Sequence, residues 1–359
     1  MRDSLVQLPR VLQPAHGREA RISEIGHTAD GVARFVMGVD GGATKTLAAV
    51  LDLEHSRLHL GRGGPSNPDA AGAQAASRAV LDACAQAIEG AGITDSDVVS
   101  AVLAIAGTDT AAVAREVETG HPDGWIVVND VVAAWSTATG AQPGVGVISG
   151  TGSNVFGVGP RGRPWRVGGW GHVLGDEGSG YWFGVQAIKA ALRDREASGP
   201  ETALSDAAVE FFAVANVEEL GALVYAKPLT KGEIAAFAVQ IAKVAEQGDA
   251  VARELFERGA RELGAQIVAV IRQTELGGPF PVGLIGSAFK AGPMFVEPLT
   301  DVVRAAAPQA RLAVVEMAPV GGSLMLAARA AGCEARIDPA GLTKLLDAQL
   351  TDQSTDAAK

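Results

Sequence analysis

Cysteine is nearly absent from this sequence of 359 residues, which contains only Cys84 and Cys333. Neither belongs to a CxxC pair or stands at the cysteine–histidine spacing of a zinc site, so the usual zinc and iron–sulfur motifs are excluded. Both lie in alanine-rich stretches with a helical pattern, where a lone cysteine is most often a small buried hydrophobe. A reducing compartment is therefore expected, and we predict a cytoplasmic protein.

Long apolar runs and an excess of positive charge are also missing. No uninterrupted apolar run reaches the roughly 18 residues that span a membrane. The net charge of −11 argues against a nucleic-acid or anionic-membrane partner. Residues 1–34 mix arginines with acids and lack the basic-then-apolar pattern of a signal peptide. We predict that they form a flexible N-terminal extension without catalytic residues.

Glycine and apolar residues are abundant. The 45 glycines predict many tight turns and close backbone approaches. The chain is 47% hydrophobic, which allows a sizeable core, and its length suits two domains of about 150 residues each. Strand patterns alternate with helix patterns, which predicts an α/β fold with more than one sheet.

The order of these patterns repeats within the chain. An apolar strand, a Gly/Thr turn and a second apolar strand begin at Phe35, and the same order begins again at Gly144. We expect strands at 35–39, 46–53, 101–107, 125–130, 280–286 and 311–317, and helices at 69–91, 131–140, 184–195, 234–247, 249–273 and 318–332. A capping box from Thr230 to Glu233 predicts where helix 234–247 begins.

The two turns carry residues that suit a phosphate ligand. The first reads Asp40-Gly41-Gly42-Ala43-Thr44-Lys45 and the second Gly150-Thr151-Gly152-Ser153. Glycine-rich turns present several N–H groups to one anion, and an acid beside a phosphate makes sense when Mg²⁺ lies between them. The first turn is neither a Walker A loop nor a dinucleotide fingerprint. A plain β-hairpin with Asp-Gly at its turn is the alternative for that loop alone.

A further acid, Asp130, ends the apolar strand 125–130. Open α/β sheets bind ligands at the carboxyl ends of their strands, which makes Asp130 a candidate ligand-site residue. The alternative role is a cap for the helix that starts at Val131. Asp176 lies in a glycine-rich loop, where acids are more often solvated than functional.

Several motifs together resemble the N-acetylglucosamine kinase group, a part of the BadF/BadG-like branch of the actin-like, sugar-kinase and Hsp70 ATPases. The resemblance covers about residues 35–345 in the right order. It is carried by DGGATKT, SNPD, VVND, ISGTGSN, GGWGHVLGDEGSGYW, GLIGSAF and PVGGSLMLAA. The most specific of these are ISGTGSN and GGWGHVLGDEGS.

The resemblance implies an α/β protein with two ribonuclease-H-like (actin-like ATPase) domains flanking a cleft. The first domain would span 35–140, completed by a helix near 338–350, and the second would span 141–337 with a helical insertion. ATP and Mg²⁺ would be the cofactors, and a homodimer is expected. The implied roles are Mg²⁺ binding by Asp40, general base catalysis by Asp130, ATP binding by Gly41, Gly42, Thr44, Lys45, Thr151, Gly152, Gly286 and Ser287, and sugar binding by Asn67, Asp69, Ser153, Asn154, Gly169, Trp170, Gly171 and Asp176.

One position departs from the family pattern. In the animal kinases an aromatic residue follows the sugar-binding asparagine by two positions, whereas here Asp69 follows Asn67. A carboxylate could pair with the ammonium group of glucosamine. The alternative is helix capping, with Asn67 as N-cap, Pro68 as the first helical residue and Asp69 near the positive helix end.

These motifs predict an ATP-dependent kinase that phosphorylates the 6-hydroxyl of glucosamine or N-acetylglucosamine. One alternative is an activator ATPase of the same branch, coupled to an iron–sulfur cluster, for which two isolated cysteines are too few and badly placed ligands. A second alternative is a non-catalytic sugar sensor, against which the intact Asp40, Asp130 and GTGS turn argue.

Overall fold

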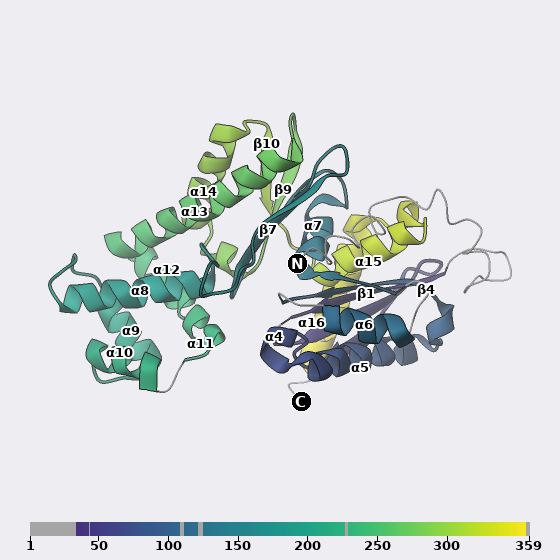
Figure 1. The fold of residues 1–359 in the computed structure, drawn as a ribbon, viewed down its shortest axis with the longest axis horizontal. Coiled ribbons are helices and arrows are strands. Elements are labelled where there is room, and N and C mark those ends of the chain that lie inside the picture. Colours follow the sequence, from purple (N-terminus) through teal and green to yellow (C-terminus); the bar gives the residue numbers. More distant parts are fainter. Residues whose placement is uncertain (1–33, 43, 108–110, 121–124, 227–228, 357–359) are drawn as a thin grey trace. The chain divides into compact units, whose positions relative to one another are not determined.

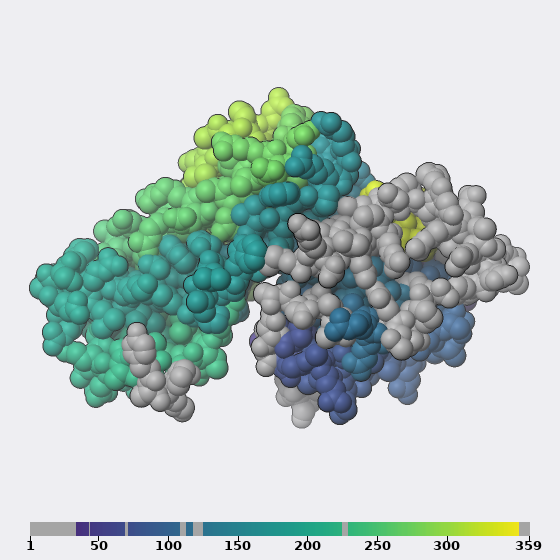
Figure 2. Space-filling model, viewed as in Figure 1, coloured from purple at the N-terminus to yellow at the C-terminus, as the bar shows by residue number. Residues whose placement is uncertain are grey.

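The computed structural model describes residues 34–42, 44–107, 111–120, 125–226 and 229–356. The predicted flexible extension lies outside these residues, except for Arg34. The chain forms two compact units, which we call unit 1 (residues 1–142 and 315–359) and unit 2 (residues 143–314). The colours in Figures 1 and 2 separate them, because unit 2 is one teal-to-green stretch while unit 1 joins purple and blue segments to yellow ones. Each unit is described by itself.

Unit 1 is built on a five-stranded sheet in the order β3-β2-β1-β4-β5. Strand β2 is antiparallel to its neighbours β1 and β3, whereas β1, β4 and β5 are parallel. The carboxyl ends of β1, β3, β4 and β5 therefore meet at one edge of the sheet, where α/β sheets place ligands. The strands are β1 (Phe35–Gly41), β2 (Thr46–Asp52), β3 (Arg57–Gly63), β4 (Val98–Ile105) and β5 (Trp125–Asn129).

Helices pack on both faces of this sheet through glycines. An added Cβ on Gly61 would lie 2.0 Å from the carbonyl oxygen of Ala83 in α5, and one on Gly38 would lie 2.6 Å from the amide nitrogen of Leu324 in α15. Only glycine allows backbones this close. The elements are α4 (Pro68–Ala71), α5 (Ala73–Ala91), η1 (Asp95–Asp97), α6 (Ala111–Gly120), α7 (Asp130–Thr139), α15 (Pro319–Ala330), η3 (Glu334–Arg336) and α16 (Pro339–Asp356).

Unit 2 contains a sheet of the same topology, β8-β7-β6-β9-β10. Here β7 is antiparallel to its neighbours β6 and β8, and β9 and β10 run parallel to β6. The repeated order read from the sequence therefore corresponds to two sheets with matching strand order and direction. The strands are β6 (Gly144–Ser149), β7 (Ser153–Val158), β8 (Pro164–Gly168), β9 (Phe280–Ile285) and β10 (Ala310–Val314).

The helices of unit 2 enclose an aromatic core. Phe183 lies 4.6 Å from Phe256 and 5.3 Å from Phe295 between ring centroids, and all three are buried. Figure 1 shows the long α13 beside α14. The elements are α8 (Gly180–Arg195), α9 (Leu204–Phe212), α10 (Val217–Ala226), α11 (Lys231–Ala236), α12 (Ala238–Glu246), α13 (Ala250–Thr274), η2 (Ser287–Ala291) and α14 (Pro293–Ala306).

Several predicted elements differ in extent from the observed ones. The single helix expected at 69–91 is broken at Gly72, whose φ of 80° is left-handed, into α4 and α5. The helix expected at 234–247 is divided into α11 and α12 by Phe237. The strand expected at 311–317 ends at Val314. Strands β3 and β8 were not predicted, because each interrupts its apolar residues with arginine, histidine or glycine.

The capping box is confirmed. The amide of Glu233 donates to the Thr230 hydroxyl at 3.2 Å, and the Glu233 carboxylate accepts from the Thr230 amide at 2.7 Å. Within the described residues, no helix is both long and apolar enough to cross a membrane.

The boundary between the units differs from the predicted domain division. The sequence places α15 in the second domain, which it extends to residue 337, whereas α15 belongs to unit 1. Its Ser323 hydroxyl donates a hydrogen bond of 2.8 Å to the carbonyl oxygen of Val39 in β1. Helix α16, near the predicted completing helix at 338–350, also lies in unit 1.

Candidate functional site

Two aspartates stand at the ligand-binding edge of the unit 1 sheet. Asp40 is the penultimate residue of β1, and Asp130 follows the last residue of β5. Both are half-buried. Because β1, β4 and β5 are parallel, the sheet brings these two carboxylates to the same edge from positions 90 residues apart in the sequence.

Burial and the charge of Asp130 both act on the carboxylate of Asp40. Desolvation among surrounding protein atoms and, after it, the charge of Asp130 raise the pKa of Asp40 to about 6, although the charge of Lys45 acts in the opposite direction. Like charges held together and partly desolvated favour a proton or a cation between them. The pair is therefore suited to a divalent metal, for which carboxylate oxygens are preferred ligands.

Helix capping does not account for Asp130. The N-cap of α7 is Asn129, whose Oδ1 accepts a hydrogen bond from the amide of Val131 at 3.4 Å, while its Nδ2 donates to the carbonyl oxygen of Gly107 at 3.0 Å. Asp130 is the first residue of α7. The alternative role read from the sequence, in which Asp130 caps this helix, is thus taken by Asn129 instead.

The first turn lies against the chain that follows β3. The amide of Gly42 donates to the carbonyl oxygen of Lys45 at 2.9 Å, and the carbonyl oxygen of Gly42 accepts from the amide of Ser66 at 3.0 Å. An added Cβ on Gly41 would lie 2.4 Å from the Ser66 hydroxyl oxygen. That buried hydroxyl has no hydrogen-bond partner among the described residues. Thr44 and Lys45 are exposed.

Asn67 directly precedes α4, the position that an N-cap residue occupies. Its carbonyl oxygen accepts the amide of Ala71 at 2.9 Å, and Pro68 is the first residue of α4. The backbone of Asp69 lies in α4, but its side chain is outside the described part of the structure. Sequence reasoning gave no role to Ser66, the first residue of the SNPD motif, and only its contact with Gly41 draws attention to it.

The second turn presents its N–H groups rather than its carbonyls. The carbonyl oxygens of Gly150 and Thr151 accept the amides of Gly180 and Tyr181 at 2.8 and 3.3 Å, which ties the turn to the start of α8. Among the residues that the structure describes, no acceptor takes the amides of Thr151 and Gly152. Such adjacent amides form an anion-binding nest.

This turn closes one end of a pocket of about 590 Å³ that lies entirely in unit 2. Residues of α11 and α12 line it, most of them small and apolar and two of them charged, together with Phe183 and Phe256. A volume in this range with a mostly apolar lining and a few polar groups is typical of small-molecule sites. The remaining lining residues are Gly150, Thr151, Gly180, Gly232, Ala235, Ala236, Ala238, Val239, Ala242, Lys243, Glu246, Ser287, Ala288, Lys290 and Ala291.

Gly286 follows the end of β9, and the next residue, Ser287, lines the pocket. Gly286 has a φ of 124°, and an added Cβ would lie 2.2 Å from the carbonyl oxygen of Ser149. A side chain there would force the ends of β6 and β9 apart. Ser287 lines the pocket beside Gly150. Of the predicted ATP-binding residues of unit 2, Thr151 and Ser287 line this pocket, whereas Gly152 and Gly286 are their neighbours in the chain and do not line it.

Behind the turn, a buried carboxylate holds the backbone. Asp176 is 3% exposed and adopts a left-handed φ of 66°, which is uncommon for aspartate. Its Oδ1 accepts the amide of Ser153 at 3.0 Å, and its Oδ2 forms an ion pair with Lys231 Nζ at 2.7 Å. The Ser153 hydroxyl donates to the carbonyl oxygen of Glu177 at 2.8 Å. Asp176 is therefore part of the buried framework rather than a solvated loop acid.

The other predicted sugar-binding residues of unit 2 lie around β7 and β8. An added Cβ on Gly169 would lie 2.7 Å from Asn154 Nδ2, and the buried Asn154 Oδ1 has no partner among the described residues. Trp170 is 54% exposed, with the guanidinium of Arg166 5.9 Å from its ring centroid. Gly171 has open space around it.

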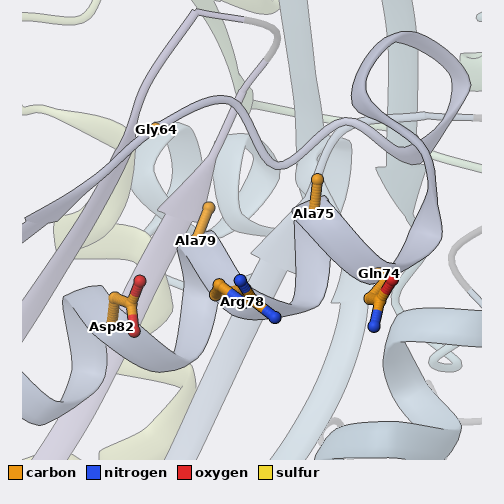
Figure 3. A pocket seen from close by; sticks show the side chains of 6 residues that line it. All are labelled: Gly64, Gln74, Ala75, Arg78, Ala79 and Asp82. Carbon is orange, nitrogen blue, oxygen red and sulfur yellow. The ribbon is translucent and has the colours of Figure 1, made fainter.

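A second pocket, of about 300 Å³, lies in unit 1 beside the start of α5. Figure 3 shows Ala75 and Ala79 directed toward the loop that contains Gly64, while Arg78 and Asp82 belong to successive turns of the helix. This pocket contains none of the predicted site residues, and we assign no function to it.

The two cysteines do not suit a shared metal cluster. Cys84 is buried in α5, within the core of unit 1, and burial raises the pKa of its thiol. Cys333 lies after the end of α15 rather than within a helix. A buried thiol with a raised pKa is an inert packing residue rather than a thiolate ligand.

Comparisons with known proteins find a matching family model and curated relatives. The model of the BadF/BadG/BcrA/BcrD ATPase family matches residues 37–327. The chain is 32% identical over 243 residues to the N-acetylmuramic acid/N-acetylglucosamine kinase of Clostridium acetobutylicum, which covers 66% of this chain and 79% of that protein. It is 28% identical over 241 residues to the glucosamine kinase GspK of Vibrio cholerae, which covers 66% and 80%.

Solved structures confirm the fold. A crystal structure from Chromobacterium violaceum, assigned as an N-acetylglucosamine kinase, has a TM-score of 0.68 and 26% identity, covering 82% of this chain and 99% of that one. A glucokinase of the ROK family from Streptomyces griseus, with a TM-score of 0.50 and 21% identity, covers 82% and 98%. With the matching topology of the two sheets, these similarities confirm the predicted α/β fold with two ribonuclease-H-like units.

Proposed function

The chain belongs to the BadF/BadG/BcrA/BcrD ATPase family, and from this premise we propose that it is an ATP-dependent amino-sugar kinase. The reaction transfers the γ-phosphate of ATP to the 6-hydroxyl of glucosamine or N-acetylglucosamine. The names of the relatives from Clostridium acetobutylicum and Vibrio cholerae support this substrate class.

The observation that carries the proposal is the pocket of unit 2 with its backbone nest. Its apolar wall suits a nucleoside, and the amides of Thr151 and Gly152 suit the attached phosphates. Gly286 and Ser287 complete the nucleoside end. In unit 1 we propose Gly41, Gly42, Thr44 and Lys45 as further phosphate-binding residues.

Asp130 is the proposed general base. Phosphoryl transfer depends mainly on positioning and charge stabilisation, and the acceptor alcohol loses its proton as the bond forms. A carboxylate within hydrogen-bond reach of that hydroxyl can take the proton. The strand-end position of Asp130 and the capping of α7 by Asn129 support this role.

Asp40 is the proposed Mg²⁺ ligand. The mutual repulsion of Asp40 and Asp130 is relieved by a cation, so the donor set fits this metal. When bound, Mg²⁺ would neutralise charge on the triphosphate oxygens. The protein residues contribute the carboxylate of Asp40 and the ammonium of Lys45.

For the sugar we propose the contacts that the family resemblance implies. The candidates are Asn67, Asp69, Ser153, Asn154, Gly169, Trp170, Gly171 and Asp176. Asp69 is further proposed to pair with the ammonium of glucosamine, in place of the aromatic residue that the animal kinases carry beside the acetyl group. Comparison of glucosamine and N-acetylglucosamine turnover in wild type and Asp69→Ala tests this, and an unchanged substrate ratio would show that Asp69 does not select the amine.

The test of the function is one coupled assay of ADP release. Glucosamine, N-acetylglucosamine, N-acetylmannosamine and glucose are supplied separately with ATP and Mg²⁺. An amino sugar should give the highest kcat/KM, with product phosphorylated at the 6-position by NMR. Sugar-independent ADP release at the same rate with all four would instead indicate an ATPase and refute the kinase proposal.

The remaining expectations are kept as proposals. We propose a homodimer in the cytoplasm, following the family resemblance, and size-exclusion chromatography with light scattering measures the oligomeric state. The iron–sulfur activator is not favoured, because the burial of Cys84 removes one of two cysteines as a ligand. A purified protein with the visible absorption of an iron–sulfur cluster would reverse that judgement.

A further inference from the structure

Lys231 is the cation that sits behind the backbone nest of unit 2. Its Nζ lies 2.7 Å from Asp176 Oδ2, and an added Cβ on Gly152 would lie 2.7 Å from both Lys231 Nζ and Asp176 Oδ1. The turn therefore packs directly against this ion pair. The backbone amides of the nest are themselves uncharged.

The same lysine begins the helix that forms a wall of the pocket. Lys231 is the first residue of α11, and Gly232, Ala235 and Ala236 of that helix line the pocket. The capping box between Thr230 and Glu233 fixes the backbone at this point. Lys231 thus joins the α11 wall to the carboxylate that holds the turn.

The helix and the turn also meet at α8. An added Cβ on Gly180 would lie 3.0 Å from the carbonyl oxygen of Ala235 and 3.1 Å from that of Gly150. Helix α11 and the turn are therefore connected at two places, through this close approach at Gly180 and through the ion pair of Lys231 with Asp176. The first connection is steric, while the second depends on two side-chain charges.

The carboxylate has few ways to compensate for the loss of this partner. The Asp176 side chain is 4% exposed, whereas that of Lys231 is 33% exposed. A buried carboxylate that loses its counter-charge is left uncompensated, which favours its turning toward water. Such a reorientation alters the hydrogen bond that it accepts from the Ser153 amide at the end of the nest.

We propose that Lys231 is a positioning residue for the nucleotide, acting through Asp176 and the Ser153 amide on the nest at Thr151 and Gly152. It sets the distance between the α11 wall and the turn, so that the nest matches the phosphates of a nucleotide whose base lies in the pocket. This inference rests on the proposed nucleotide site. It assigns Lys231 no contact with the transferred phosphate.

The experiment is calorimetric titration of the full chain with the Mg²⁺ complex of a non-hydrolysable ATP analogue. The variants are Lys231→Met, Lys231→Arg, Asp176→Asn and the double variant of Lys231→Met with Asp176→Asn. The matched control is Lys189→Met, which removes an exposed lysine from α8 of the same unit. All titrations are made well below the melting temperature of each variant, so that only folded protein is compared.

We expect Lys231→Met to raise the Kd by about tenfold or more, the effect of misplacing a hydrogen-bond donor to a charged group. Lys231→Arg should recover most of the affinity, and Lys189→Met should leave it unchanged. In the kinase assay KM for ATP should rise more than kcat falls. Since the effect passes through Asp176, the double variant should bind no more weakly than the weaker single variant.

A purely structural ion pair predicts a different result. In that case Lys231→Met lowers the melting temperature but leaves the Kd of the folded protein within about twofold of wild type, a change below half a kcal/mol, and the proposal is overturned. A wild-type chain that binds no nucleotide overturns it as well. A chain that binds the analogue but phosphorylates no sugar defeats the kinase function alone, because the titrations still test Lys231.

Discussion

Asp40 and Asp130 oppose each other electrostatically at one edge of the unit 1 sheet. The charge of Asp130, together with the larger effect of desolvation, raises the pKa of Asp40 to about 6. An acid with a raised pKa in the folded state binds its proton more tightly there than in the unfolded chain. At neutral pH, where it is ionised, it therefore reduces stability, and this loss develops as pH rises from about 4 to above 6.

Asp40→Asn should consequently make the chain more stable while abolishing Mg²⁺-dependent transfer. A shift to about 6 corresponds to roughly 3 kcal/mol at neutral pH. Because Asp40 is only half-buried, we expect a gain of about 1–2 kcal/mol in the free energy of unfolding. Urea denaturation with a chelator present measures this gain in the free energy of unfolding. The measurement is made at pH 7.5, about 1.5 units above the pKa of Asp40.

The control for this gain is Asp82→Asn, which removes an exposed carboxylate from α5. It should change stability by less than about 0.5 kcal/mol. If Asp40→Asn is no more stable than the control, the desolvation and repulsion inferred at this edge are wrong.

Asp130→Asn should separate binding from chemistry. The N-cap at Asn129 remains, so α7 should form as before. Loss of a general base lowers kcat by about 10²–10⁴-fold, while the Kd for the sugar, measured by calorimetry, should change little. Turnover comparable to wild type would remove Asp130 as the base.

Gly286→Ala should damage the proposed nucleotide pocket and the fold together. The new Cβ would lie 2.2 Å from the carbonyl oxygen of Ser149, and φ would remain at 124°. Steric overlap and backbone strain should lower the free energy of unfolding by about 2–4 kcal/mol. Calorimetry with the ATP analogue should also show weaker binding.

Gly277→Ala is the matched control, because Gly277 has open space around it. Its stability should stay within about 0.5 kcal/mol of wild type. Equal effects of the two substitutions would contradict the close approach assigned to Gly286.

Asp52 should give the chain a specific sensitivity to acid. Burial alone would raise the pKa of Asp52, but hydrogen bonds from the Arg34 and His55 side chains and from the amides of His55 and Glu54 lower it to about 2. Glu54 also pairs with Arg34. A lowered pKa means that the stabilisation is present above the unfolded value of 3.8 and is lost as pH falls toward 2.

Urea denaturation of wild type and Asp52→Asn between pH 2 and 6 measures this loss. The wild type should be the more stable above pH 4, and the difference should shrink steadily at lower pH. A difference that is independent of pH would show that Asp52 stabilises the fold by packing rather than by charge.

Much of the fold was predictable because local pattern and tertiary structure agree. The repeated strand–turn–strand order at Phe35 and Gly144 corresponds to two sheets of one topology. Strands β3 and β8 were missed because Arg57–Gly63 and Pro164–Gly168 carry too few apolar residues. Their strand conformation is stabilised by pairing with β2 and β7, which no local pattern reveals.

The candidate site was likewise predictable from the sequence only in part. The acids at Asp40 and Asp130 were recognisable because each follows an apolar run, and the turn at Gly150 because of its glycines. Lys231 was predicted only as a helix start, and Asp176 would by pattern be a solvated acid. Only contacts between segments 55 residues apart showed them to be an ion pair behind the nest.

By itself the sequence determined the chemistry that this protein carries: strand-end carboxylates, glycine turns and apolar strands, all encoded by neighbouring residues. The tertiary structure alone decided which groups face one another, because distant segments meet only after the sheets have formed. It assigned the cap of α7 to Asn129 rather than Asp130 and buried Asp176 against Lys231. Partner choice in a folded chain depends on spatial distance and desolvation, and neither is a property of a residue's neighbours in sequence.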